Sequence, residues 1–157
     1  MRNNEQGFSG ARRQNDFRGQ GQVERKLVRE VNDQNYVEEA EKVILEMKQQ
    51  RRDGKNNPEI TTSKLRNLLS MTADIYNIVI HQNSDTLPEE IKARIEYLRV
   101  RFYYEAGREE GVKQLVEKAG LVEMLKNIKG SRKKYISFNR YMEALVAFHR
   151  FHGGKDI

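Results

Sequence analysis

The feature that most constrains this sequence is the spacing of apolar residues between positions 91 and 106. Apolar side chains recur there every three or four residues, which places them on one narrow face of an α-helix. That face consists of Ile91, Ile95, Leu98, Phe102 and Ala106. A different face carries Arg94, Tyr97, Arg101, Tyr104 and Arg108. The period predicts a helix with one side in a core and the other facing a negatively charged, planar partner.

The same period recurs along most of the chain. Apolar stripes and turn residues predict helices at about 36–52, 62–82, 88–107, 109–119, 121–128 and 131–151, the fifth being a short helix or a continuation of the fourth. Thr86 and Glu89 are predicted to form a capping box, with Pro88 in the first turn, and Gly107 is predicted to end the third helix. No strand pattern competes, so the expected fold class is all-α, a compact bundle of five to six helices.

Residues 1–32 differ in composition, being rich in Gly, Gln and Asn and poor in apolar side chains. Such a segment cannot bury enough apolar surface to offset the entropy of ordering it. We therefore expect a basic, flexible N-terminal extension at 1–32 and a helical domain at 33–157. The alternative is an arm that holds RNA through its arginines while its phenylalanines stack on bases. The residues of that arm would be Arg12, Arg13, Arg18, Phe8 and Phe17.

Charge and composition narrow the class of partner. The 157 residues carry a formal net charge of +6, which favours polyanions, with nucleic acid ahead of an anionic membrane. The chain has no cysteine, so a disulfide framework or a thiolate metal site is excluded. A long apolar run and a signal-peptide core are also missing, and we expect a soluble, cytoplasmic protein without membrane partners.

Catalytic motifs are not found in the sequence. It contains no phosphate-binding loop, no dinucleotide-binding glycine pattern, no nucleophile elbow and no H-E-x-x-H motif. His149 and His152 have the i, i+3 spacing of two metal ligands, but no further ligand accompanies them. The alternative places His149 at the edge of the core and His152 in solvent near a helix C-terminus. We expect no catalytic residue, no metal and no cofactor.

The arginines of the third predicted helix are the better lead. Arg94, Arg101 and Arg108 recur every seven residues, about 10.5 Å along a helix. Arginine binds phosphate through two parallel hydrogen bonds, and the intervening tyrosines can stack on bases. The alternative is a solvated face whose arginines pair with Glu96, Glu105 or Glu109, with the tyrosines at the core edge. The spacing alone does not decide between them.

Three blocks of sequence carry a resemblance to a known family. They are T-T-S-K-L-R-N-L-L at 61–69, Y-L-R-V-R-F-Y-Y-E-A-G-R-E at 97–109, and R-Y-M-E-A-L-V-A at 140–147, which leads to G-G-K-D at 153–156. In this order and spacing they closely resemble the small subunit of type III-A CRISPR (Csm) effector complexes. The resemblance covers about residues 33–157, so the N-terminal extension is not part of it.

The resemblance implies a helical, non-enzymatic subunit that stacks in several copies along the inner filament of the complex. Its implied partners are the RNA-binding backbone subunits, the large subunit, further copies of itself and the guide RNA–target RNA duplex. RNA cleavage in such complexes belongs to the backbone subunits, and DNA cleavage and cyclic oligoadenylate synthesis belong to the large subunit. The resemblance does not identify which residues contact RNA. The candidates inside the matching blocks are Lys64, Arg66, Arg99, Arg101, Arg108 and Arg140. Arg94 is added from its position on the basic helical face, and Lys133 and Lys134 are added on charge density alone.

Alternatives exist for the residues and for the function. Arg66 and Arg140 are also suited to structural salt bridges between helices, and Lys133 and Lys134 to a solvated turn. The whole chain is also compatible with a purely protein-packing helical subunit, or with a freestanding helical protein that binds nucleic acid.

Overall fold

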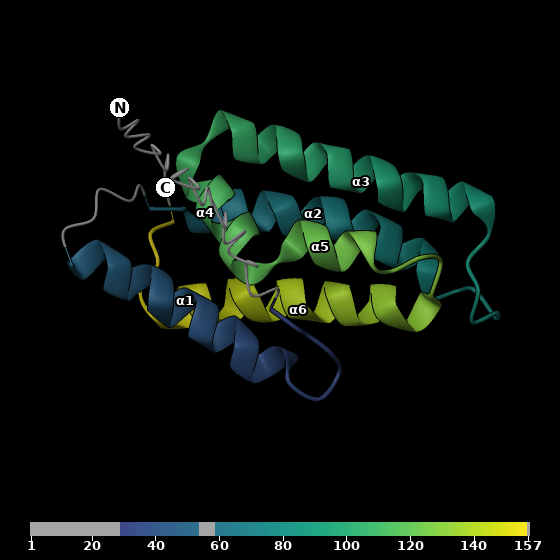
Figure 1. Cartoon of the computed structure of the whole chain (residues 1–157), viewed down its shortest axis with the longest axis horizontal. Helices are drawn as coiled ribbons and strands as arrows, with labels where there is room; N and C mark the ends of the chain where they lie inside the picture. Colours follow the sequence, from purple (N-terminus) through teal and green to yellow (C-terminus); the bar gives the residue numbers. More distant parts are fainter. Residues whose placement is uncertain (1–28, 54–58, 157) are drawn as a thin grey trace, which may run out of the picture.

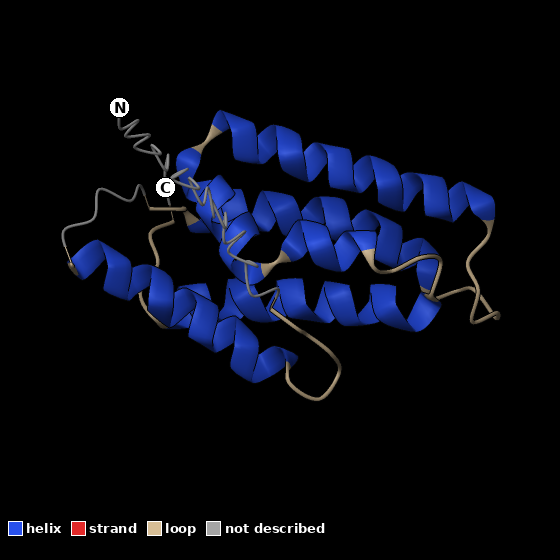
Figure 2. Cartoon of the chain, viewed as in Figure 1, coloured by secondary structure: helices blue, strands red, loops and turns tan. Residues whose placement is uncertain are grey.

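The structure is a computed structural model that describes residues 29–53 and 59–156, and this part of the chain is a bundle of α-helices (Figure 2). The helices are α1 (Tyr36–Arg52), α2 (Thr62–Val79), α3 (Glu89–Arg108), α4 (Glu110–Ala119), α5 (Leu121–Lys126) and α6 (Arg132–Phe151). Within the described ranges the only β-type pairing is an isolated bridge between Thr86 and Ser131. The predicted all-α fold class is therefore confirmed.

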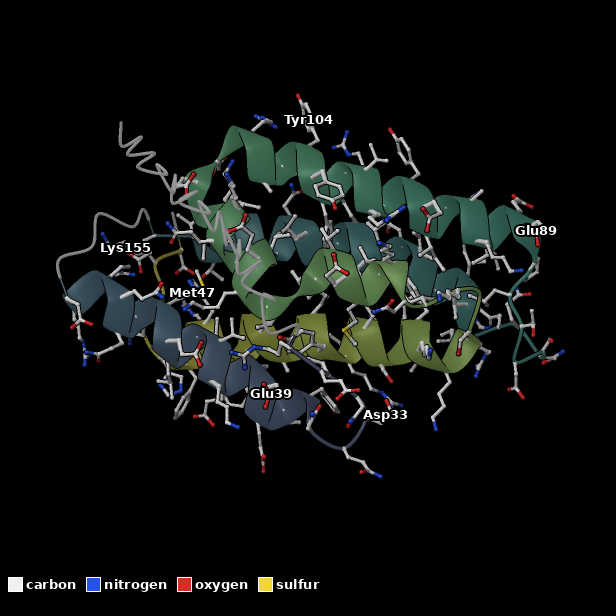
Figure 3. The ribbon with its side chains drawn as sticks, viewed as in Figure 1. Asp33, Glu39, Met47, Glu89, Tyr104 and Lys155 are labelled. Carbon is white, nitrogen blue, oxygen red and sulfur yellow. The ribbon has the colours of Figure 1, made fainter. Side chains whose placement is uncertain are left out.

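Helix α6 lies at the centre of the contacts, because both α1 and α2 pack along it. Helix α3 packs on α2, α4 and α5 and forms one outer edge of the bundle (Figure 1). Its outer side points away from every other labelled helix, and Tyr104 projects from that side (Figure 3). The fold thus leaves one long face of α3 available to a partner.

The core follows the apolar periods predicted from the sequence. All five residues of the α3 stripe are buried, and Phe102 lies 6.1 Å from Phe138 of α6 between ring centroids. The Tyr135 ring lies 6.2 Å from Phe138, and its hydroxyl donates to the Thr72 carbonyl at 2.6 Å. Val37 at the start of α1 is an apolar residue outside the core and is 48% exposed.

The first turn of α2 is completed by the C-terminal segment. The Thr61 hydroxyl accepts a hydrogen bond from the Lys64 amide, as its position at the N-cap predicts. The amide of Thr62 donates to the Lys155 carbonyl at 2.6 Å, and residue 63 donates to the Asp156 carbonyl. These bonds satisfy the orphan donors of the helix, so residues 155 and 156 act as a cap supplied from far along the chain.

Two predicted features of α3 are wrong. Pro88, not Thr86, is the N-cap, and no side chain caps the helix, because Thr86 instead forms the bridge to Ser131. Gly107 does not end the helix, which continues to Arg108. A Cβ at Gly107 would meet nothing within 4 Å, so this glycine lies on an open face where it is tolerated.

The described chain begins at Arg29, inside the predicted extension. Arg29 donates from Nε to the Lys118 carbonyl at 3.2 Å and from its guanidinium to Glu39 and Glu46. The segment from residue 29 is therefore tied to α1 and to the end of α4. The predicted boundary after residue 32 stays a prediction, and the arginines and phenylalanines of the predicted arm lie outside the described residues.

Candidate nucleic-acid interface

Arg101, Tyr104, Glu105 and Arg108 form a compact cluster on α3, which we call the α3 cluster. Both guanidinium carbons lie 5.6 Å from the centroid of the Tyr104 ring, within cation–π range. Both arginines also approach the Glu105 carboxylate, at 3.6 and 3.5 Å. Because the Glu105 side chain is only 7% exposed, it acts as a fixed anchor from within the bundle. Two cations share one anion, so the cluster keeps a net positive charge.

The remaining arginines of α3 pair with acids one turn away. Arg94 lies 3.7 Å from Glu90, and Arg99 lies 2.6 Å from Glu96. Of the pairings expected as the alternative for Arg94, Arg101 and Arg108, the one with Glu105 is confirmed for Arg101 and Arg108. Arg94 pairs with Glu90 instead, and Glu96 pairs with Arg99. The pairs between exposed groups contribute little to stability, since they are screened by water.

The tyrosines of α3 do not lie at the core edge, so that part of the alternative is wrong. Tyr97 is 64% exposed and Tyr104 is 56% exposed. The neighbouring Val100 and Tyr103, which sequence reasoning did not single out, are also exposed. The outer face of α3 therefore combines arginine forks with open aromatic rings.

Lys64 and Arg66 take different positions on α2. Lys64 pairs with Glu109 at 2.5 Å, and so lies beside the C-terminal end of α3. Glu109 therefore pairs with Lys64 of α2, and not with an arginine of α3 as the alternative had predicted. Arg66 is exposed and forms no salt bridge with the described residues. The structure brings Lys64, but not Arg66, into contact with the end of the α3 face.

The three candidates on α6 are also exposed. Arg140 has no ion-pair partner in the described part of the chain, so the interhelical salt bridge expected as its alternative is not seen there. Lys134 donates to the Asn127 carbonyl at 3.4 Å, and its amide is capped by the Ser131 hydroxyl. The neighbouring Arg132 is structural, because its guanidinium donates to two carbonyls at the end of α2.

Lys133 and Lys134 line a groove that the sequence did not predict, because its second wall comes from distant residues. We call it the lysine groove, and its volume is about 690 Å³. One wall is the segment 29–34, and the other comes from α5, the following turn and α6. The residues of that second wall are Met124, Asn127, Lys129, Lys133, Lys134 and Ser137. Of the lysines in it, Lys129 was not among the residues predicted to bind RNA.

His149 is held inside the bundle by both ring nitrogens. Nε2 lies 2.9 Å from the Ile60 carbonyl, which can only accept, so Nε2 carries the proton. Nδ1 then accepts from the Thr62 hydroxyl at 3.0 Å. His152 is also engaged, by Glu41 at 3.1 Å, and is only partly exposed. The described residues contain no group of three or more His, Cys, Asp or Glu side chains arranged to hold a metal.

Burial lowers the pKa of His149 below its ordinary value of 6.5, despite the opposing hydrogen bond to Ile60 and the charge of Glu59. Below about pH 6.5, His149 therefore binds a proton more readily in the unfolded chain than in the folded chain. The free energy of unfolding consequently falls as the pH decreases. We expect this residue to contribute a slope of at most about 1.4 kcal/mol per pH unit. Urea unfolding at pH 7.5, 6.5 and 5.5, compared with His149→Gln, checks it. Equal slopes for both proteins would contradict the assignment.

None of the helices in the described ranges combines the length and the apolar character needed to cross a lipid bilayer.

The sequence of this chain is similar to that of one known protein family. The family model described as Csm2 Type III-A matches residues 30–155. A protein of Streptococcus thermophilus named CRISPR system Cms protein Csm2 is 44% identical over 126 residues, which span 80% of this chain and 98% of the relative. Proteins of the same name from Mycobacterium tuberculosis (strain H37Rv) and Enterococcus italicus are 45% identical over 102 residues and 36% identical over 121 residues. These two matches span 82% and 86% of the relatives, and 65% and 72% of this chain, respectively.

Proposed function

Because the chain belongs to the Csm2 family, the small subunit of type III-A CRISPR (Csm) complexes, we propose that it is a non-catalytic subunit that contacts RNA. In this proposal it lines the channel of the guide RNA–target RNA duplex during antiviral defence. Its partners are the backbone RNA-binding subunits, the large subunit and further copies of itself, in the cytoplasm. It requires no cofactor, since its role is to hold a duplex whose sequence is read by base pairing.

The observation that carries the proposal is the α3 cluster on the open face of α3. Its two guanidinium groups are already placed by the Tyr104 ring and by Glu105, so little side-chain entropy is lost on binding. Guanidinium forks match phosphate oxygens, and such contacts position a nucleic acid without reading its bases. An interface of this kind suits a subunit that must accept any guide sequence.

We expect Arg101→Gln combined with Arg108→Gln to weaken binding of a complementary target RNA by the assembled complex about tenfold. Each lost phosphate contact should also reduce the log–log salt slope by about one unit or slightly less. Glutamine is preferred to glutamate here, because two more carboxylates beside the buried Glu105 would destabilise the fold. Fluorescence anisotropy over a salt series measures both quantities.

The matched control is Arg150→Gln together with Lys155→Gln, which also removes two exposed cations, at the C-terminal end. This control should bind target RNA with unchanged affinity and slope. If the α3 variant assembled normally and behaved like the control, the α3 cluster would not be an RNA contact.

A second candidate, a subunit that only packs against proteins, is favoured by one observation. Val100 and Tyr103 add exposed apolar surface to the α3 face, and such surface is typical of protein interfaces. It predicts that the two α3 substitutions prevent assembly of the complex and leave no intact complex with weaker RNA binding. Size-exclusion chromatography of the purified complex distinguishes the two outcomes.

A further inference from the structure

We propose that the lysine groove is a second RNA site, in which Lys129 and Lys133 contact phosphates of the sugar-phosphate backbone. The inference rests on the proposed function, since it specifies a further surface through which this subunit meets RNA. It lies at the turn between α5 and α6 and on the segment before α1, away from the α3 cluster.

The charge of the groove favours a phosphate ligand. Lys129 and Lys133 are exposed and form no salt bridge with any described carboxylate, whereas every arginine of α3 is paired with an acid. The acids of the groove, Glu30 and Asp33, come from the opposite wall. Asp33 is already engaged, because its carboxylate accepts a hydrogen bond from the Ser137 hydroxyl. The ammonium groups on the α5–α6 side are therefore available to an external anion.

The backbone of Lys129 has a conformation that is unusual for lysine. Its φ is +46°, and it is the only non-glycine residue with a positive φ in the described ranges. Glycine or asparagine adopts this left-handed conformation more easily than lysine does. Local sterics therefore do not explain a lysine here, and strained positions of this kind gather at binding sites.

The turn that carries Lys129 is also held firmly. The Ser131 amide donates to the Ile128 carbonyl at 2.9 Å, and the Leu87 amide donates to the Gly130 carbonyl at 2.8 Å. The Arg132 amide donates to the Asp85 backbone carbonyl at 2.9 Å, which ties the turn to the loop before α3. Because both sides of the turn are bonded, the lysine backbone is positioned before any ligand arrives.

The shape of the groove favours a polymer backbone over a free phosphate ion. It is open, and its size is within the range of small-molecule sites, so a nucleotide unit can enter. Met124 and Val31 supply apolar surface for a ribose, while the amide of Asn127 supplies hydrogen bonds. The lysines at the α5–α6 turn lie on one side of that surface, where they can contact phosphates.

The test uses Lys129→Gly combined with Lys133→Gln in the full chain, assembled with guide RNA into the effector complex. Glycine removes the ammonium group and relaxes the backbone, so the thermal midpoint of the subunit should not fall. Binding of a labelled complementary RNA should weaken about tenfold, and the salt slope should drop by one to two units, roughly one per contact. Lys133→Gln alone should show about half of the change in slope.

The matched control is Lys113→Gln, at an exposed lysine of α4 without an ion pair in the described part of the chain. It should leave affinity and slope unchanged. Unchanged binding by the groove variant, with weaker binding by the α3 variant, would overturn the groove site and leave the proposed function standing. Unchanged binding by both variants would overturn both. Loss of assembly with the groove variant would identify the groove as a protein contact and would also overturn the inference.

Discussion

Phe138→Ala is expected to lower the free energy of unfolding by about 3–5 kcal/mol. Phe138 is completely buried, and its ring lies against Phe102 of α3 and against Tyr135, whose hydroxyl is bonded to α2. Alanine leaves a cavity that three packed helices cannot close, so both transfer free energy and dispersion contacts are lost. For a domain of this size the thermal midpoint should fall by roughly 10–20 °C. Calorimetry and urea denaturation measure the two quantities.

The control applies the same chemical change on the surface. Phe151 lies at the end of α6 and is 79% exposed, so Phe151→Ala should change stability by no more than about 0.5 kcal/mol. Phe138→Leu, which keeps most of the volume, should cost less than half as much as alanine. Equal effects of the two alanine substitutions would show that the Phe138 ring does not pack against Phe102 and Tyr135 as described.

Arg29→Ala is expected to cost about 2 kcal/mol, the second-largest effect we predict. The Arg29 side chain is 19% exposed and joins α1 to the last turn of α4 through Glu39 and the Lys118 carbonyl. A cation at a helix C-terminus also interacts favourably with the helix dipole. Without the guanidinium, the Glu39 carboxylate stays largely buried with only Lys42 as a described partner. Urea denaturation of the full chain measures the loss.

The pH dependence of the Arg29→Ala effect gives a second readout. Burial acts to raise the pKa of Glu39, but hydrogen bonds from Arg29 and Lys42 outweigh it and lower the pKa below 4.5. The stabilisation is thus present above that pH and is lost as the pH falls through the lowered pKa. The cost of the substitution should shrink in acid, while Arg140→Ala, at an exposed position, should cost little at any pH. A cost that did not change with pH would count against the Arg29–Glu39 pair.

The apolar periods were sufficient to predict the helices. Residues such as Ile95, Leu98 and Phe102 recur at helical spacing because one face of the helix is buried. The folded protein buries this same face. Capping was less predictable, because competing partners decide it. Thr61 caps α2, but Thr86 forms a bridge to Ser131, and no pattern within the segment 86–89 reveals that choice.

The candidate interface was only partly predictable, since its residues belong to different elements. The pairing of Arg101 and Arg108 with Glu105 is local, and the helical spacing offered it as an alternative. In contrast, Arg29 donates to the Lys118 carbonyl 89 positions away, and the composition of residues 1–32 does not predict that contact. The lysine groove depends in the same way on two walls that meet only in the folded chain. Composition predicted a basic surface but not its shape.

The first turn of α2 donates hydrogen bonds to the carbonyls of Lys155 and Asp156, and these bonds affect the order of folding during synthesis. Ser63 and Asp156 are 93 positions apart, so α2 leaves the ribosome well before its cap exists. Closing a loop of that length is entropically unfavourable until α1, α3 and α6 have packed. The start of α2 is therefore among the last parts of the bundle to be completed, after residues 155 and 156 have been translated.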